Sequence, residues 1–350
     1  MNQEVPIELL LQQETTEDKQ YSFEPKSFDE FLGQEEIKSK LKIYVQAAKM
    51  RGEPLDHILL FGPPGLGKTT LARVITQELE VRFKITSAPI LERAGDLVAI
   101  LSSLEHREIL FIDEIHRLPT NVEEILYSAM ENYCVDVIIG QGAGAKSIRL
   151  PLNPFTLVGA TTKTSLISGP LQTRFGIVER LDFYNPEELS CIVKQNAAFL
   201  GYPIEHEAAI TIGHRARGTP RLVKRILRRI RDFAQVNQKT IIDIETVNQA
   251  LKLLDIDQDG LTKLDRRILT HIINDFDGGP VGLETLAAMT GEDKDTLEEV
   301  CEPYLLRQGF LQKTSRGRQI PAKRYHSICR KLGIKFKEIA EQEPLFHNKT

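Results

Sequence analysis

Short apolar runs alternate with amphipathic segments along the first half of the chain. Residues 28–52 carry apolar side chains at helical spacing, and Gly52 stands where such a helix would end. The runs that follow have the length and composition of buried strands, and they are HILLFG, RFKITS, EILFID and FTLVGAT. Strands of this kind separated by helices predict an α/β fold, with a doubly wound parallel sheet covered by helices on both faces.

The pattern changes beyond Tyr184, where apolar residues recur at helical spacing in four successive segments up to Ile256. After a polar linker, DIDQDG, it predicts helices at 263–276, 283–289 and 294–308, then two short strands around a Ser-Arg-Gly turn, which is typical of a winged helix. The predicted divisions are a disordered tail at 1–20, a large α/β domain at 21–184, a small helical domain at 185–256, a winged-helix domain at 257–335 and a C-terminal tail at 336–350.

The segment CVDVIIGQGAGAKSIRL, at 134–150, alternates apolar and polar residues on each side of a glycine-rich turn, which predicts a β-hairpin. The period of two places Val135, Val137 and Ile139 on one face of this hairpin. Such an aliphatic stripe can pack on its own domain or dock on a partner. The residues alone favour packing on the domain.

The segment GPPGLGKTT, at 62–70, follows an apolar run and matches the pattern of a phosphate-binding loop. Glycines let backbone N–H groups turn towards phosphate oxygens, and a helix that begins at Lys68 directs its positive end at the same anion. The expected contacts are backbone at Gly62, Gly65 and Gly67, the ammonium of Lys68 at the β and γ phosphates, Thr69 at Mg²⁺ and Thr70 near the α phosphate. The predicted cofactors are therefore ATP and Mg²⁺.

Further residues suited to nucleotide hydrolysis follow later strands. Asp113 and Glu114 end a buried strand, at the edge where open α/β sheets bind ligands. Asp113 would hold the metal, and Glu114 would polarise the attacking water. A strand that ends in GATT brings Thr161 and Thr162 beside the γ-phosphate. The arginines that could reach phosphate, from LQTRFG and GTPR, are Arg174 and Arg221, although either could equally be a solvated side chain.

Composition is that of an ordinary globular protein, with 41% hydrophobic and 27% charged residues among 350, and no apolar run is long enough to span a bilayer. The polar, acidic N-terminus lacks the pattern of a secretory signal, so we expect a cytoplasmic location. The four cysteines are widely spaced, with neither CxxC pairs nor nearby histidine pairs, which disfavours disulfides and metal sites.

The formal net charge of −4 hides an uneven distribution of charge. Residues 304–337 contain no acidic side chain, and a second basic run covers 215–231. The side chains expected to meet DNA phosphates are Lys313, Arg316 and Arg318 in the wing and Lys294 at the start of the helix before it. A merely solvated basic tail is the alternative. The helix that bears Arg225, Arg228 and Arg229 could serve contacts between subunits.

The order of these motifs resembles that of AAA+ ATPases. In detail, DHILLFGPPGLGKTTLA, LFIDEIHRL, PFTLVGATT, RFGI, RARGTPR, GGPVGLETLAA and EPYLLRQGFLQKTSRGR resemble the RuvB family of Holliday junction branch-migration motors, from about Tyr21 to Arg324. The resemblance implies an AAA+ P-loop ATPase domain, a helical lid and a C-terminal winged helix. It further implies ATP hydrolysis coupled to translocation of duplex DNA in recombination and repair.

The same resemblance implies a homohexameric ring in which Arg174 reaches the γ-phosphate bound by the neighbouring subunit. It implies that Arg221 senses nucleotide from the lid. It assigns further nucleotide contacts to Tyr184, to Phe23 and Glu24 in the N-terminal segment, and to Glu131, Asn132 and Tyr133. Through Val135, Val137 and Ile139 the hairpin would dock on the partner RuvA, and the resolvase RuvC would join a larger assembly, with no membrane involved.

The chain departs from the family pattern at three positions. Glu24 stands where an arginine is usual, and an acid cannot donate to a nucleotide as a guanidinium does. Asn132 replaces a usual aspartate, and Ala143 replaces a usual proline in the hairpin turn. None of these positions coincides with Lys68 or Arg174, so we expect activity to survive.

Two other functions would use a similar nucleotide core. A clamp-loader-like switch would open a sliding clamp, and it would carry a C-terminal helical collar in place of the wing that GFLQKTSRGRQ predicts. A DNA-binding regulator gated by nucleotide would bind particular sequences, which competition with random DNA would reveal.

Overall fold

The computed structural model describes residues 23–139 and 146–334 of the chain. They fold into two compact units, one that ends at Leu251 and one that begins at Lys252. In neither unit does a described helix have the length and apolar character needed to cross a bilayer.

A five-stranded parallel sheet forms the centre of the first unit, in the order β2-β3-β6-β1-β7. Its strands are β1 (Ile58–Phe61), β2 (Phe83–Ser87), β3 (Ile109–Asp113), β6 (Thr156–Thr161) and β7 (Ile177–Arg180). The four predicted strands are confirmed, and β7 is a fifth that the apolar pattern did not predict. The prediction of burial was wrong for β2, because this strand lies at the sheet edge and leaves Ile85 46% exposed.

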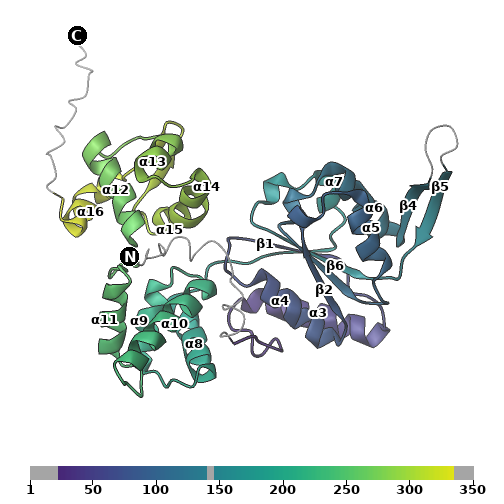
Figure 1. Cartoon of the computed structure of the whole chain (residues 1–350), viewed down its shortest axis with the longest axis horizontal. Helices are drawn as coiled ribbons and strands as arrows, with labels where there is room; N and C mark the ends of the chain where they lie inside the picture. Colours follow the sequence, from purple (N-terminus) through teal and green to yellow (C-terminus); the bar gives the residue numbers. More distant parts are fainter. Residues whose placement is uncertain (1–22, 140–145, 335–350) are drawn as a thin grey trace, which may run out of the picture. The chain divides into compact units, whose positions relative to one another are not determined.

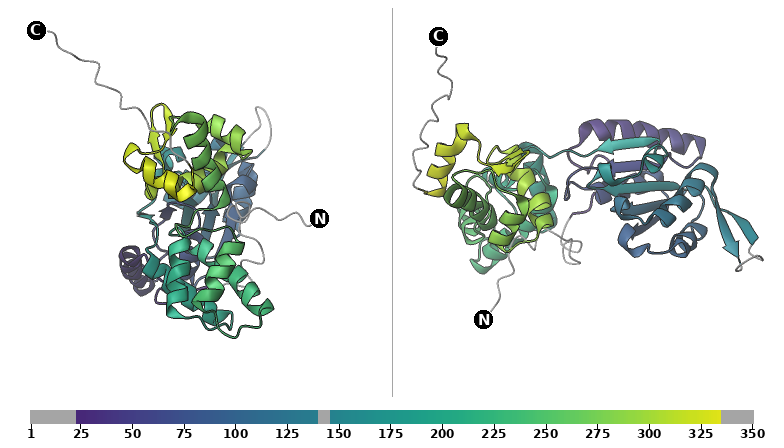
Figure 2. Two further views of the ribbon diagram at one scale, coloured as in Figure 1. Left: turned by 90° about the vertical axis from the view of Figure 1, so that its left-hand side faces the viewer. Right: turned by 90° about the horizontal axis from the view of Figure 1, so that it is seen from above.

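Helices cover both faces of this sheet, as predicted. Helices α3 and α4 lie together on one face, and α5, α6 and α7 lie on the other (Figure 1, Figure 2). The bounds are α3 (Glu35–Arg51), α4 (Lys68–Leu79), α5 (Ala94–Ser102), α6 (Thr120–Asn132) and α7 (Gly169–Gln172), with 3₁₀ turns η1 (Ala88–Ile90), η2 (Ile115–Arg117) and η4 (Thr164–Leu166). Gly52 ends α3 as predicted, because it adopts the left-handed conformation with φ 71°.

The parallel arrangement brings three chemically distinct segments to one edge of the sheet. The central strands β1, β3 and β6 are almost wholly buried, and their apolar side chains fix the strand register against the flanking helices. The phosphate loop follows β1, Asp113 ends β3 and Thr161 ends β6. Because β6 pairs with both neighbours in parallel, these three carboxyl ends lie side by side.

The predicted hairpin is present and projects from the sheet domain (Figure 1). Strands β4 (Cys134–Ile139) and β5 (Lys146–Pro151) pair antiparallel, so Val137 lies opposite Ile148 on one face. On the other face the carboxylate of Asp136 accepts two hydrogen bonds from Arg149, at 3.0 and 3.2 Å. Ala143 lies outside the described residues.

Four helices complete the first unit, and they are α8 (Pro186–Phe199), α9 (His206–Arg215), α10 (Pro220–Val236) and α11 (Ile244–Leu253). A capping box between Asn185 and Glu188 begins α8. Along α10, Arg225 and Arg228 are buried, whereas Arg229 is half-exposed and pairs with Asp232. Arg225 and Arg228 therefore belong to the interior of these four helices, which we call the lid, and not to a free surface for subunit contacts.

The second unit has the predicted winged-helix elements. They are α12 (Lys263–Phe276), α13 (Leu283–Thr290), α14 (Lys294–Thr296), the π turn η5 (Leu297–Cys301), α15 (Glu302–Arg307), β8 (Gln312–Thr314), β9 (Gly317–Gln319), the turn η6 (Ala322–Arg324) and α16 (Tyr325–Leu332). The third predicted helix is thus interrupted by a π turn just before Pro303, whose ring cannot continue an α-helical ladder. A capping box between Thr262 and Asp265 fixes the start of α12.

Candidate nucleotide site, docking hairpin and DNA-contacting wing

The phosphate loop has the backbone geometry that its sequence predicts. Gly62, Gly65 and Gly67 all have positive φ, at 140°, 79° and 98°, which side chains rarely tolerate. A Cβ atom on Gly62 would collide with the carbonyl oxygen of Leu181. The glycines therefore permit both the turn and a close approach to the segment after β7.

Lys68 begins α4 and is buried at the centre of the site. Its ammonium donates to the carbonyl oxygens of Gly62 at 2.8 Å and Pro63 at 3.1 Å. Burial lowers the pKa of Lys68 to about 8, although the negative charges of Glu114 and Asp113 oppose that shift. Because no carboxylate pairs directly with the ammonium in the described part of the chain, its charge remains available to a phosphate.

The acidic pair at the end of β3 is held in two different ways. The Asp113 carboxylate accepts the backbone N–H of Glu114 at 3.0 Å, and Glu114 itself adopts a left-handed conformation with φ 49°. A carboxylate oxygen of Glu114 lies 3.2 Å from Nδ1 of His116 and 3.4 Å from the hydroxyl of Thr162. Sequence reasoning did not single out His116, and the only signal was its place two residues after the acid pair.

The two threonines after β6 have different surroundings. Thr161 is fully buried, and its hydroxyl lies 2.9 Å from Nδ1 of His116 and accepts the N–H of Lys163 at 3.0 Å. Thr162 is half-buried and reaches Glu114. The hydroxyl of Thr161 is thus bonded within the protein, and the placement of Thr161 and Thr162 beside the γ-phosphate stays a prediction. Thr162 is the hydroxyl next to the carboxylate of Glu114.

The metal-binding prediction concerns Thr69, in the first turn of α4, and Asp113. Among residues 23–139 and 146–334, no cluster of three or more acidic, histidine or cysteine side chains could enclose a cation. Mg²⁺ in a phosphate-loop site takes only one or two protein ligands and completes its shell with phosphate oxygens and water. One hydroxyl and one half-buried carboxylate are therefore a suitable donor set for Mg²⁺ that arrives with a nucleotide.

Two residues connect the lid to the phosphate loop. The backbone N–H of Arg221 donates to the carbonyl of Gly65 at 3.3 Å, and the hydroxyl of Tyr184 donates to the carbonyl of Leu66 at 3.2 Å. Burial raises the pKa of Tyr184, so its hydroxyl stays protonated as a donor. Nε of Arg221 is buried without a hydrogen-bond partner among the described residues, which suits a site that receives an anion.

The N-terminal segment packs against the lid and the loop. The N–H of Phe23 donates to Asn196 at 3.1 Å and its carbonyl accepts from Lys224 at 3.1 Å, while its ring meets Phe199 edge to face. Glu24 is exposed. Sequence reasoning missed Phe31, a buried ring that lines the phosphate loop beside Gly67.

Arg174 belongs to a separate cluster on α6 and α7. Its guanidinium pairs with Glu131 at 2.8 Å, lies over the ring of Tyr127 at 4.5 Å and donates to the carbonyl of Pro170 at 2.6 Å. Lys68 and Glu114 are not among its contacts in the described part of the chain.

The other two residues expected near the nucleotide follow Glu131 along α6. Asn132 is exposed, and Tyr133 packs edge to face on Phe155. The structure thus groups Arg174 with Glu131 at the end of α6 and does not bring either to the phosphate loop of the same chain.

The aliphatic stripe of the hairpin changes from buried to exposed along its length. Val135 is 1% exposed and belongs to the core cluster of the sheet domain, and Val137 packs partly against it. The prediction that Val135 faces a partner was therefore wrong, because this residue anchors the hairpin. Ile148, opposite Val137, is 50% exposed and was not predicted. The side chain of Ile139 lies outside the described part.

Three of the four side chains expected to contact DNA are paired with acids. Lys294 pairs with Glu284, and Lys313 lies 3.3 Å from Glu298. Arg316, at the turn between β8 and β9, is exposed. Lys294, Lys313 and Arg316 are thus all exposed, and the first two each have a carboxylate partner.

Arg318 is different from the other three. It is buried beside α15 and donates to both carboxylate oxygens of Glu302, at 2.5 and 3.3 Å. The prediction that Arg318 contacts DNA was therefore wrong in this structure, because its guanidinium neutralises a buried acid.

Three family models match the chain. The Holliday junction DNA helicase RuvB P-loop domain matches residues 23–181, the RuvB AAA lid domain matches 184–257, and the RuvB C-terminal winged helix domain matches 258–328. Among solved structures, the Thermotoga maritima RuvB Holliday junction branch migration motor is 49% identical, with a TM-score of 0.79, over 90% of this chain and 99% of that one. Two mutants of the same protein are 48% identical, with TM-scores of 0.80 and 0.81, over 90% of this chain and 99% of theirs.

Proposed function

The chain belongs to the RuvB family of Holliday junction DNA helicases, ATP-driven motors of branch migration, and we propose that it hydrolyses ATP at a site shared between two of its copies. In this proposal the copies form a homohexameric ring around duplex DNA, and RuvA holds the junction. The observation that carries the proposal is the separation of Arg174 from the phosphate loop of its own chain.

We propose that the phosphate loop, Lys68 and Thr70 bind ATP, with Thr69 and Asp113 as the protein ligands of Mg²⁺. Glu114 then polarises the attacking water, and His116 with Thr162 orients its carboxylate through the contacts described above. Arg221 meets the phosphates from the lid, where its unpartnered Nε supports the role. The bound Mg²⁺ would supply charge neutralisation at the phosphates.

In the proposed ring Arg174 acts on the nucleotide of the neighbouring subunit. Glu131 and Tyr127 hold its guanidinium at the domain surface, where its side chain is 20% exposed. A guanidinium supplied from a neighbour stabilises the charge that develops during phosphoryl transfer, and in well-studied cases this is worth about 10³–10⁵ in rate. Hydrolysis would therefore depend on assembly.

The winged unit would grip duplex DNA through phosphates. Arg316 at the tip of the wing is the main candidate, and Lys313 and Lys294 follow once phosphate replaces their carboxylate partners. For RuvA, the exposed distal half of the hairpin stripe, with Ile148 and Val137, is the proposed docking surface, since Val135 is used internally. RuvC would join this assembly.

Mixing two inactive variants tests the shared site. Lys68→Ala removes the contact with the phosphates, and Arg174→Ala removes the guanidinium that a neighbouring subunit would supply. Each variant alone should therefore hydrolyse ATP far more slowly than wild type. In an equimolar mixed ring one interface in four joins an intact loop to an intact arginine, so roughly a quarter of the wild-type rate should return. Mixtures that exchange subunits but recover no activity would contradict the shared site.

A synthetic four-way junction tests the motor itself. Wild-type protein with ATP should dissolve the junction, faster when RuvA is present, and Glu114→Gln should bind the junction without dissolving it. Because Gln cannot polarise water as a carboxylate does, binding should persist while turnover stops.

A further inference from the structure

The segment Leu181–Asn185 joins the last strand of the sheet, β7, to the first lid helix, α8. Near its start the N–H of Leu181 donates to the carbonyl of Phe61, at 2.8 Å, where the phosphate loop begins. Near its end the hydroxyl of Tyr184 donates to the carbonyl of Leu66 within that loop. Movement of the lid relative to the sheet must therefore bend this hinge segment, which is tied to the loop at both ends.

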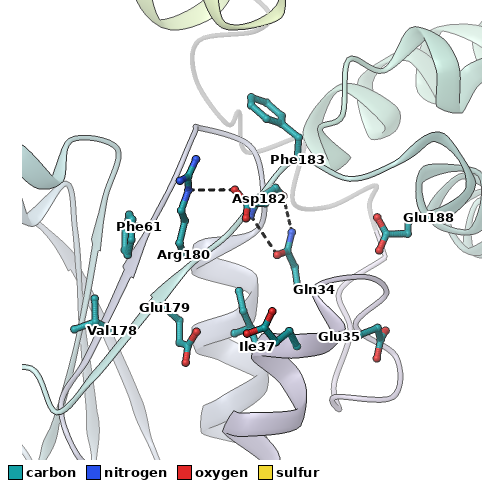
Figure 3. Close-up of a pocket in the computed structure, with 11 residues that line it drawn as sticks. Gln34, Glu35, Ile37, Phe61, Val178, Glu179, Arg180, Asp182, Phe183 and Glu188 are labelled. Atoms are coloured by element: carbon teal, nitrogen blue, oxygen red, sulfur yellow. Dashed lines mark hydrogen bonds and ion pairs between the residues drawn. The ribbon is translucent and has the colours of Figure 1, made fainter. Parts of the chain in front are cut away.

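Between these two ties, one side chain holds the backbone of Asp182. The amide Nε2 of Gln34 donates to the carbonyl of Asp182 at 2.6 Å, and Oε1 of the same amide accepts its N–H at 3.3 Å (Figure 3). The carboxylate of Asp182 pairs with Arg180 at 3.1 Å. Holding a carbonyl and an N–H together requires a donor and an acceptor on one planar group, which a carboxamide supplies.

The backbone of Gln34 is unusual for a residue with a side chain. It adopts the left-handed conformation, with φ 54° and ψ 40°, immediately before α3 begins. A glycine would adopt this conformation at no steric cost, whereas any other residue pays a penalty from its Cβ atom. The two hydrogen bonds that the Gln34 side chain makes to the hinge can offset part of this cost.

The two hydrogen bonds between Gln34 and Asp182 form what we call the clamp, and a pocket of about 540 Å³ lies beside it (Figure 3). Carboxylates dominate its polar lining, and they are Glu35 and Glu36 of α3, Glu179 of β7, Asp182 of the hinge and Glu188 of α8. The hinge thus borders open space on this side instead of tightly packed apolar core. The polar clamp is what fixes Asp182 there, and the pocket leaves room for the segment to change its conformation.

We propose that Gln34 is a positioning residue that couples ATP hydrolysis to movement of the lid, an inference that rests on the motor function proposed above. By fixing Asp182 to the start of α3, it confines bending to residues 183–185, so that changes at the phosphate loop turn the lid in one direction. Without the clamp the hinge bends at Asp182 as well, and part of the movement is lost. Hydrolysis itself continues, since Lys68 and Glu114 are not among the contacts of Gln34 in the described residues.

The test compares Gln34→Met with wild type in the full-length protein. Methionine has a similar length and volume, and its Cβ atom pays the same penalty in the left-handed backbone conformation. It lacks the hydrogen-bond donor and acceptor of the carboxamide. Three quantities are measured, namely affinity for ATP, hydrolysis in the presence of junction DNA, and junction dissolved per ATP consumed. We expect the first two to stay within about threefold of wild type and the third to fall about tenfold, the scale set by two lost hydrogen bonds.

Two further variants sharpen the result. Gln34→Glu should uncouple more strongly, because a carboxylate would face the Asp182 carbonyl beside other acids. Lowering the pH protonates that carboxylate and restores a donor, so its junction yield per ATP should rise relative to wild type at the same pH. Gln46→Ala, at an exposed position within α3, is the matched control and should behave as wild type.

The outcomes separate the inference from the function on which it rests. A Gln34→Met protein that moves the junction as efficiently per ATP as wild type overturns the coupling role and leaves the motor intact. Equal loss of hydrolysis and migration also overturns it, because Gln34 would then merely support the nucleotide site. Wild-type protein that hydrolyses ATP without moving any junction overturns the motor function itself, and the coupling role with it.

Discussion

Replacing Arg318 with alanine separates a structural role in the winged unit from a role in DNA binding. The change leaves the carboxylate of Glu302, whose side chain is only 6% exposed, without its counter-ion. Removing one partner of a buried ion pair typically costs about 3–5 kcal/mol of the free energy of unfolding. A domain of this size has a total stability of roughly 5–15 kcal/mol, so the change removes a large fraction of the free energy of unfolding.

This loss of stability can be measured by following the thermal unfolding of the full chain in a calorimeter. The transition of the winged unit in Arg318→Ala should move down by more than about 10 °C, since each kcal/mol shifts the midpoint of a small domain by about 4–8 °C. The double variant Arg318→Met with Glu302→Leu removes both charges and keeps similar volumes. Such replacements are often neutral, so its transition should lie near that of wild type.

DNA affinity is then measured on the folded double variant by fluorescence anisotropy with a duplex of random sequence. We expect a dissociation constant within about threefold of wild type, because the guanidinium of Arg318 does not reach the surface. Two results would refute this reasoning. One is a stable Arg318→Ala protein with strongly weakened DNA binding, and the other is a stable double variant that has lost DNA affinity.

Three further predictions follow from the same structure. Burial lowers the pKa of Lys68 to about 8, so the charged ammonium is lost as the pH rises through that value. Affinity for a fluorescent ATP analogue should therefore decline between roughly pH 7.5 and pH 9. An affinity that does not change with pH would contradict the proposed contact between Lys68 and the phosphates. Glu298→Gln should strengthen binding to duplex DNA about two- to threefold in anisotropy titrations, because Lys313 would no longer have to leave a carboxylate partner to bind a phosphate. Unchanged affinity would show that the Lys313–Glu298 ion pair does not affect DNA binding. On the hairpin, Ile148→Asp should weaken association with RuvA in a pull-down and change the free energy of unfolding by less than about 0.5 kcal/mol. Val135→Ala should instead lower the free energy of unfolding by about 1–3 kcal/mol, because Val135 is buried. The opposite pattern would restore Val135 as the docking residue.

The sheet and the phosphate loop could be predicted from the sequence because their signals are local. Buried strands such as β3 are continuous apolar runs, and the glycines with positive φ stand at fixed offsets from Lys68. The strand β7 escaped prediction for the same reason. Its four residues, IVER, include only two apolar side chains, and parallel pairing with β1 is what makes them a strand.

The errors in the candidate site concern which way a side chain points and what lies opposite it. Arg318 looked like a phosphate contact because its neighbours in the chain are basic, yet its partner Glu302 lies sixteen residues earlier and meets it only after folding. Thr161 and Thr162 are adjacent, and only the strand orientation decides that Thr162 reaches Glu114. Ion pairs and side-chain orientations of this kind depend on tertiary structure, and no spacing rule in the sequence reports them.

The buried start of the hairpin has a consequence for any experiment that removes the hairpin to test the proposed docking of RuvA. Excising β4 and β5 would pull Val135 out of the apolar cluster that also holds Leu126 and Met130 of α6, and a void would open under that helix. The same helix carries Glu131, the carboxylate that grips Arg174. A deletion meant to abolish docking would thus also disturb the ion pair that holds Arg174, the proposed catalytic arginine. Only substitutions at the exposed end of the hairpin would test docking separately.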